Sequence, residues 1–139
     1  MRREEQRRLA VFALYQHDLT GRSLADLLDN NTLAFTRELA EGTLAERERI
    51  DPVIARNLKG WTLDRLEPLD RNLLRVAIYE LINRTDVPPE VAIDQAIELA
   101  KLYCSADAPG LVNGILASVL REIEHPLDRS NGKSEHSDD

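Results

Sequence analysis

The feature that most constrains the fold is a spacing of apolar residues that repeats with the period of an α-helix along almost the whole chain. In segment 3–19, Val11, Leu14, Tyr15 and Leu19 fall on one stripe. No segment shows the period-two alternation that is typical of a half-buried β-strand. Aromatic residues make up only 4% of the 139 residues, which disfavours an all-β sandwich. The sequence therefore predicts one compact all-α domain.

Six or seven helices joined by short links are expected. Gly21 ends the first helix, Ser23 caps the second and Thr32 caps the third, while Asp51 and Pro52 together begin the fourth. A connector with one short turn follows at 61–65. The predicted helical ranges are 3–19, 24–28, 32–47, 52–59, 68–83, 89–104 and 109–124.

Apolar faces predict which helices are most enclosed. Segment 3–19 is apolar around most of its circumference and is expected to be central. Segment 89–104 leaves only a narrow polar seam, so both of its sides should be packed. Leu74 and Ile115 lie within continuous apolar stripes and are predicted core residues. The expected inward residues of the last helix are Val112, Ile115, Leu116, Val119, Leu120 and Ile123.

Charge is distributed unevenly along the chain. The net charge of −7 argues against non-specific binding to nucleic acid by charge alone. Four arginines nevertheless fall within the first eight residues, beside Glu4 and Glu5. Residues 1–125 are predicted to form the helical domain, and the polar, acidic stretch 126–139 is predicted to be a disordered tail.

No catalytic constellation is visible. His17, His125 and His136 lack metal-ligand spacing, and neither phosphate-binding glycine motif is present. Cys104 has no evident base beside it and is interpreted as a small buried or helix-end residue. A single cysteine also excludes an internal disulfide. The sequence thus predicts a non-enzymatic cytoplasmic protein with no metal, no cofactor and no membrane segment.

Three features are unexpected for a simple helical core. Gly114 stands where a helix former is expected, which predicts that another helix or a ligand approaches closely. Glu80 falls on the apolar stripe of Leu73 and Val76, either exposed at its edge or binding a cation from a partner. The arginine-rich start either presents guanidinium groups to RNA or is an ordinary charged N-terminus paired with its own glutamates.

Four segments resemble the NusB family of transcription antitermination factors, in register from about residue 3 to 124. They are RRLAVFALY at 7–15, LLRVAIYEL at 73–81, VPPEVAIDQAIELAK at 87–101 and LVNGIL at 111–116. The resemblance implies two packed helical bundles and a non-enzymatic role. It implies binding of boxA RNA in the leaders of ribosomal RNA operons together with NusE, a small-subunit ribosomal protein. Other Nus factors and RNA polymerase would then be reached indirectly.

The resemblance also implies site residues. The RNA-facing set is Arg2, Arg3, Arg7, Arg8, Lys101, Asp107, Leu111 and Asn113, and the NusE-facing set is Tyr15, Tyr79 and Glu80. Three departures from the family pattern stand out. Glu4 and Glu5 interrupt the arginine-rich segment, Leu111 replaces a phenylalanine, and Ala108 replaces a serine. Loss of that ring would weaken stacking on a base by about 1–3 kcal/mol if the position touches RNA.

Two alternatives remain open. The first is a NusB-like accessory RNA-binding module related to ribosomal RNA cytosine methyltransferases, which is disfavoured because a polar tail stands where a catalytic domain would follow. The second is a helical adaptor that binds proteins only, which is favoured if the arginines make no RNA contact. The sequence does not decide between a monomer and a homodimer.

Overall fold

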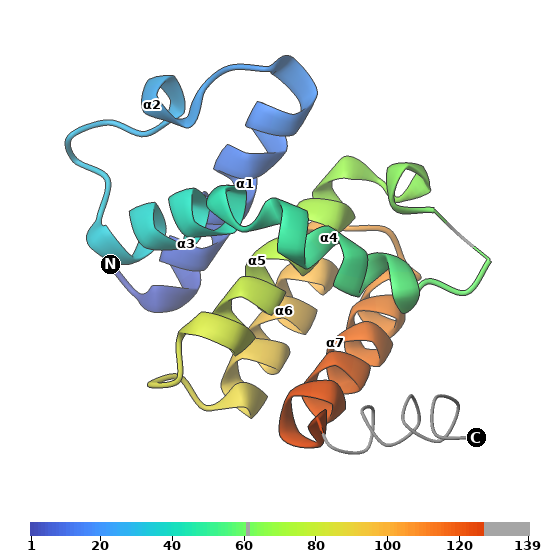
Figure 1. Cartoon of the computed structure of the whole chain (residues 1–139). Helices are drawn as coiled ribbons and strands as arrows, with labels where there is room; N and C mark the ends of the chain where they lie inside the picture. The colour runs from blue at the N-terminus through green and yellow to red at the C-terminus, as the bar shows by residue number, and fades with distance from the viewer. Residues whose placement is uncertain (61, 127–139) are drawn as a thin grey trace, which may run out of the picture.

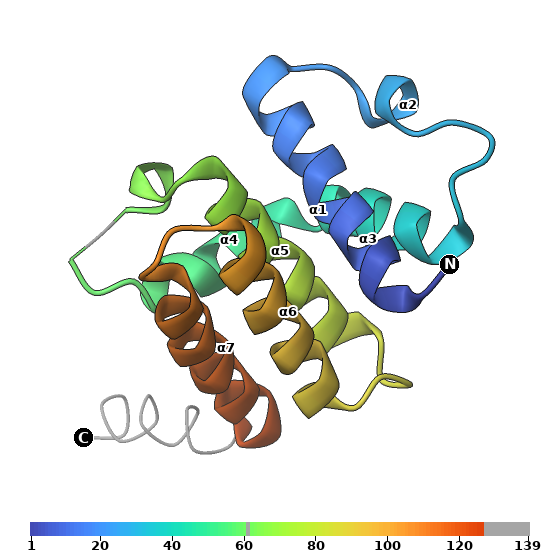
Figure 2. The same ribbon diagram turned by 180° about the vertical axis from the view of Figure 1, so that it is seen from behind.

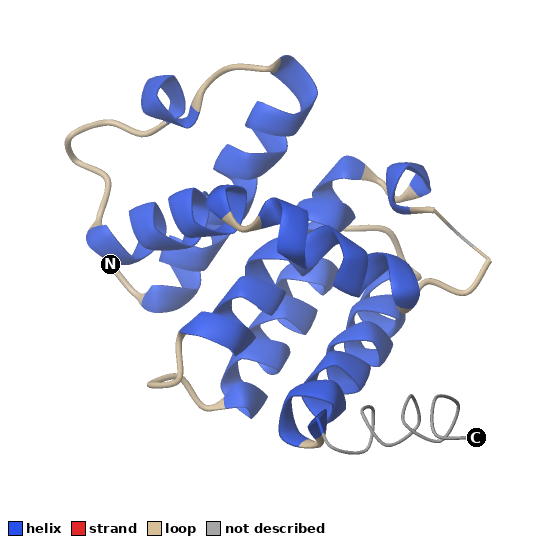
Figure 3. Cartoon of the chain, viewed as in Figure 1, coloured by secondary structure: helices blue, strands red, loops and turns tan. Residues whose placement is uncertain are grey.

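A computed structural model describes residues 1–60 and 62–126, and every regular element in these ranges is a helix (Figures 1 and 3). The predicted all-α fold is therefore confirmed. The predicted tail lies outside the described residues, except for Pro126. The elements are α1 (Arg3–Thr20), α2 (Leu24–Leu27), α3 (Ala34–Ala45), α4 (Arg47–Arg56), the 3-10 turn η1 (Leu63–Arg65), α5 (Pro68–Asn83), α6 (Pro89–Tyr103) and α7 (Ala108–Glu124).

The helices form two groups that meet at α5. Helix α1 packs on α2 and α3, whereas α5, α6 and α7 pack against one another and α4 lies across α5 (Figures 1 and 2). Helix α5 also contacts α1 and α3, and all of its residues from Asn72 to Glu80 are buried. The central helix is consequently α5, and the expectation that segment 3–19 would be central is wrong. Leu9 and Leu19 of α1 are exposed.

The predicted helix boundaries at Gly21 and Ser23 are confirmed, whereas that at Thr32 is wrong. Gly21 ends α1 with φ of 76°, and the Ser23 hydroxyl accepts a hydrogen bond from the Asp26 N–H. The Thr32 hydroxyl accepts a hydrogen bond from the Asp29 N–H in the preceding turn and does not cap the helix. Helix α3 begins at Ala34, after Leu33.

Asp51 and Pro52 do not begin a helix. Helix α4 starts at Arg47 and carries Pro52 in its interior, and it ends at Arg56 before Gly60. The Asp51 carboxylate accepts two hydrogen bonds from Arg75 of α5, at 2.8 and 2.9 Å. A tertiary ion pair thus replaces the predicted capping role of Asp51.

The core follows the predicted stripes over most of its length. Leu74 and Ile115 are buried, as are Val112, Leu116 and Val119 of α7. Ile123 is exposed, contrary to expectation, because it lies in the last turn of α7. Helix α6 packs against both α5 and α7, as its two apolar faces predict: Ala92, Ile93, Ala96 and Ala100 are buried, whereas Val91, Leu102 and Tyr103 are exposed.

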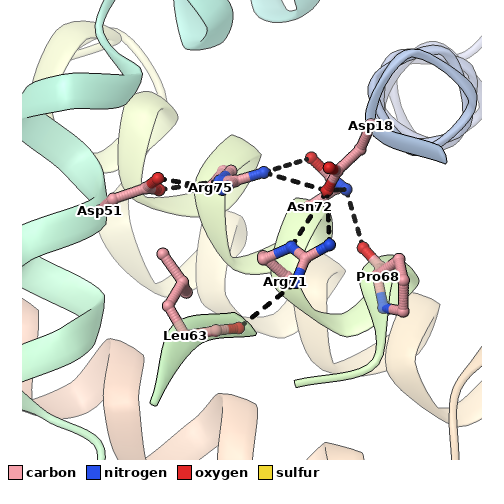
Figure 4. A network of polar contacts seen from close by, with 7 residues as sticks. All are labelled: Asp18, Asp51, Leu63, Pro68, Arg71, Asn72 and Arg75. Carbon is pink, nitrogen blue, oxygen red and sulfur yellow. Dashed lines mark hydrogen bonds and ion pairs between the residues drawn. The ribbon is translucent and has the colours of Figure 1, made fainter. Parts of the chain in front are cut away.

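A polar network joins the two helix groups (Figure 4). Asp18 of α1 pairs with Arg71 at 2.8 Å and with Arg75 at 3.3 Å, and it accepts a hydrogen bond from Asn72 at 2.9 Å. Arg75 extends on its other side to Asp51 of α4. The carboxylates of α1 and α4 are therefore held to α5 by the same guanidinium group.

Within the described ranges, no helix has the length and apolar character needed to cross a membrane.

Candidate RNA and partner interface

The buried residue of the arginine-rich segment is Arg7. Its guanidinium donates three hydrogen bonds to the Glu80 carboxylate, between 2.6 and 3.1 Å, and the two side chains are 7% and 1% exposed. The expectation that Arg7 projects from the surface is wrong, because Glu80 on α5 draws it into the interior. The interpretation of Glu80 as an exposed edge residue is wrong for the same reason.

The other three arginines remain accessible to different degrees. The side chains of Arg2, Arg3 and Arg8 are 84%, 49% and 32% exposed. Arg2 and Arg8 pair with Glu4 at 3.0 Å and Glu5 at 4.0 Å. Ion pairs this exposed are worth about 0–1 kcal/mol, so an RNA phosphate can displace the glutamates at little cost.

Arg3 also takes part in an internal cluster around Phe35 of α3. The guanidinium carbons of Arg3, Arg84 and Arg7 lie 4.5, 5.0 and 5.3 Å from the centre of its ring. Asp86 pairs with Arg3 at 3.7 Å and with Arg84 at 2.8 Å. The Arg84 hydrogen bonds lower the pKa of Asp86 to about 2, although burial opposes this shift. Two of the four arginines, Arg3 and Arg7, thus help to fix the start of α1 on α3 and α5.

Arg8 begins a connection between α1 and the end of α6. Its guanidinium carbon lies 5.9 Å from the centre of the Phe12 ring, within the range of a cation–π contact. Phe12 in turn meets Tyr103 edge to face, with ring centres 5.1 Å apart. Tyr103 is 44% exposed. The two ends of this connection, Arg8 and Tyr103, place a cation and an aromatic ring at the surface. We call Arg8, Phe12 and Tyr103 the Arg8–Tyr103 strip.

Phe12 and Tyr103 are not among the predicted site residues. The position of Tyr103 in the last turn of a helix, two residues from Lys101, was the available signal. The sequence does not show that Phe12 of α1 packs against that turn. The structure thereby connects Arg8 to the end of α6 through Phe12.

The remaining predicted RNA residues lie at the end of α6 and the start of α7. Lys101 has a side chain that is 58% exposed and pairs with Glu98 at 3.5 Å. Asp107 and Asn113 are exposed, and Leu111 is partly buried. Gly114 is also exposed, and a Cβ atom added there would meet no heavy atom within 4 Å. The expected close approach of another helix to Gly114 is therefore wrong for the described chain.

The three residues expected to face NusE are not equally accessible. Tyr15 is partly buried, whereas Tyr79 is 7% exposed and Glu80 is 2% exposed. The Tyr79 ring lies directly against Gly42 of α3, in the space that a Cβ atom would take. Burial and the nearby carboxylates of Glu38 and Glu46 raise the pKa of Tyr79. Tyr79 and Glu80 are therefore buried in the free chain and contribute almost no exposed surface.

The described residues contain no group of three or more His, Cys, Asp or Glu side chains arranged to hold a metal ion. Cys104 follows the last turn of α6 and is partly buried, as interpreted from the sequence. Burial, together with Asp70, raises the pKa of its thiol to about 12. A thiol with that pKa is protonated at neutral pH and is a poor nucleophile.

The chain is similar to one known family of proteins. The model of the NusB family matches residues 4–121. The transcription antitermination protein NusB of Symbiobacterium thermophilum is 37% identical over 89% of this chain and 92% of its own length. The NusB of Saccharopolyspora erythraea is 40% identical over 84% and 85%. The NusB of Heliobacterium modesticaldum is 52% identical over 65% of this chain, which spans 44% of that relative.

Solved structures show the same fold. NusB of T. maritima superposes with a TM-score of 0.80 at 36% identity, covering 88% of this chain and 92% of that one. A structure of the antitermination factors NusB and NusE in complex with double-stranded RNA superposes with a TM-score of 0.76 at 26% identity, covering 86% and 96%.

Fold and relatives together define the class: this is an all-helical transcription antitermination protein and not an enzyme. More narrowly, the match over residues 4–121 shows that the chain belongs to the NusB family.

Proposed function

We propose that this chain binds boxA RNA from ribosomal RNA operon leaders together with NusE, and so promotes complete transcription of those operons in the cytoplasm. The observation that supports this most directly is the Arg8–Tyr103 strip. It places a partly exposed guanidinium and an exposed aromatic ring on adjoining helices. Arginine binds phosphate, and aromatic faces stack on unpaired bases.

The RNA contacts that we propose are the accessible members of the predicted set together with the aromatic end of the strip. Arg2, Arg3 and Arg8 would meet phosphates along the start of α1, and Lys101 would do so beside Tyr103. Asn113 and the bare backbone at Gly114 allow close approach at the start of α7. Leu111 and Asp107 border this region. Arg7 is assigned a supporting role, since it is held by Glu80.

Binding by the chain alone is expected to be weak. Few free cations face RNA on a protein of net charge −7, so few counterions are released on binding. A NusB relative is found with NusE and RNA in one complex. NusE bound near Tyr15, with Tyr79 and Glu80 beneath, would supply additional phosphate contacts. Other Nus factors and RNA polymerase would be engaged through this complex.

The test is fluorescence anisotropy of a labelled boxA RNA strand, with and without NusE, across a series of salt concentrations. Arg2→Ala combined with Arg8→Ala should weaken the complex and flatten its salt dependence by about one to two units of slope. Tyr103→Leu should weaken binding through loss of stacking, by about 1–3 kcal/mol, with little change in slope. Arg49→Ala is the matched control, since Arg49 on α4 has a side chain that is 81% exposed.

Unchanged affinity and slope for the double arginine variant in the presence of NusE would contradict the proposal. The chain would then be better described as a helical adaptor that binds proteins only. Gly114→Ala gives an independent check, because it should leave the fold intact and weaken RNA binding only if RNA approaches that backbone.

A further inference from the structure

A cavity of about 340 Å³ lies at the N-terminal end of α5, away from the Arg7–Glu80 pair at the other end of that helix. Its inner wall is formed by buried residues, among them Leu66 and Asp70, and its mouth is formed by exposed polar residues. The loop before α7 and the first turn of α7 close the opposite side. The cavity thus has an inner wall of apolar side chains with one carboxylate, and a polar rim, as ligand sites usually do.

Asp70 is the unusual group in this cavity. The residue is 5% exposed, and it lies close enough to the Cys104 thiol to raise the pKa of that thiol. An S–H group is a weak donor, whereas an ionised carboxylate can accept about four hydrogen bonds. A carboxylate in such a position is stabilised only when donors, water or a cation reach its oxygens. Most of its acceptor capacity therefore remains for a group that enters the cavity.

The charges of the rim indicate which group that is. Glu67 and Asp107 are exposed beside Arg65, so the lining carries three carboxylates, including Asp70, against one cation. This balance repels a phosphate and attracts a cation. A planar guanidinium can donate two parallel hydrogen bonds to one carboxylate, which is the strongest pairing available to Asp70.

We propose that this cavity binds an arginine side chain from a basic segment of a protein partner. The guanidinium pairs with Asp70, the aliphatic stem packs on Leu66 and Leu111, and Glu67 and Asp107 attract neighbouring cations of the segment. This surface is separate from the one proposed for NusE, and it does not depend on RNA binding by the Arg8–Tyr103 strip. Asp107 and Leu111 lie at the border of the two surfaces.

The experiment uses the full ¹⁵N-labelled chain and two capped tripeptides, Ac-Ala-Arg-Ala-NH₂ and its citrulline analogue. Citrulline keeps the shape of arginine and removes the charge. The arginine peptide should shift the amide resonances of residues 66–70 and 105–111, with an affinity about tenfold or more above that of the citrulline peptide. Asp70→Asn should reduce the affinity for the arginine peptide toward that of the citrulline peptide. Asp94→Asn, which alters an exposed carboxylate on α6, should not change it.

Because Asp70→Asn removes a buried charge and could disturb folding, Glu67→Gln with Asp107→Asn provides a second variant at exposed positions. This pair should weaken the arginine peptide and make its binding less sensitive to salt. Equal binding of the arginine and citrulline peptides would overturn the proposal. So would shifts of the same amides that are stronger with guanosine monophosphate, which would indicate a nucleobase site, or shifts that depend on protein concentration alone, which would indicate a second copy.

Discussion

Arg7 and Glu80, which are 73 positions apart in the sequence, form an ion pair of 2.6 Å in which both side chains are almost completely buried. The pair joins the start of α1 to the last turns of α5. The family resemblance assigns Arg7 to RNA and Glu80 to NusE. Their pairing means that a loss of RNA or NusE binding on substitution of either residue has to be separated from a loss of folding.

Arg7→Ala and Glu80→Ala are each expected to lower the free energy of unfolding by about 3–5 kcal/mol, because each leaves an uncompensated buried charge. Urea denaturation followed by circular dichroism measures this directly. Replacing both groups together, as Arg7→Met with Glu80→Leu, should cost much less than the sum of the two single changes. Arg2→Ala should stay within about 0.5 kcal/mol of the parent. Single variants as stable as the parent would show that the pair is not buried in solution.

The lowered pKa of Asp18 predicts that the folded protein loses stability in acid. Burial alone would raise its pKa, but hydrogen bonds from Asn72 and Arg71, with the charges of Arg71 and Arg75, lower the pKa below 3.8. A carboxyl whose pKa is lower in the folded state contributes stability above its unfolded pKa and loses it as pH falls through the folded value. Urea midpoints should therefore fall below about pH 4. Asp18→Asn should flatten that part of the profile, and Asp94→Asn should not.

Two glycine substitutions are expected to have opposite effects. Gly42→Ala should destabilise by about 1–3 kcal/mol, because the new methyl group would overlap the buried Tyr79 ring. Gly114→Ala should stabilise by about 1 kcal/mol, because the position is helical and open. Thermal denaturation of the two variants is the measurement. A stabilised Gly42→Ala protein would mean that Tyr79 does not pack against α3.

Leu74→Ala and Ile115→Ala should each destabilise by about 2–5 kcal/mol, since both residues are buried in the core shared by α5 and α7. Ile123→Ala is the matched control: it also shortens a large apolar residue on α7, but at a position that is 41% exposed. It should cost less than either core change. Three similar losses would contradict the assigned inner face of α7.

The candidate site was only partly readable from the sequence. Resemblance to the family located the two regions that were expected to face RNA, but it treated the arginines as equivalent. Contacts with Glu80, Asp86 and Phe35 decide which of the arginines is free to bind RNA. These three residues lie far from Arg3 and Arg7 in the sequence, and no local pattern predicts that they pair. Phe12 and Tyr103 were missed for the same reason, since their contact requires α1 to pack on α6.

The sequence by itself determined the helical fold class, the buried stripes around Leu74 and Ile115, and the turn at Gly21, because periodicity and glycine conformation act over a few neighbouring residues. Only the tertiary structure decided that α5 is the central helix and which partner each charged side chain binds. The local sequence predicts Asp51 as a helix cap, but its carboxylate accepts hydrogen bonds from Arg75 instead. A buried guanidinium is destabilising without a carboxylate partner, and this cost exceeds that of an uncapped helix start. Local patterns propose where a polar side chain can bind, and packing decides which partner lies within reach.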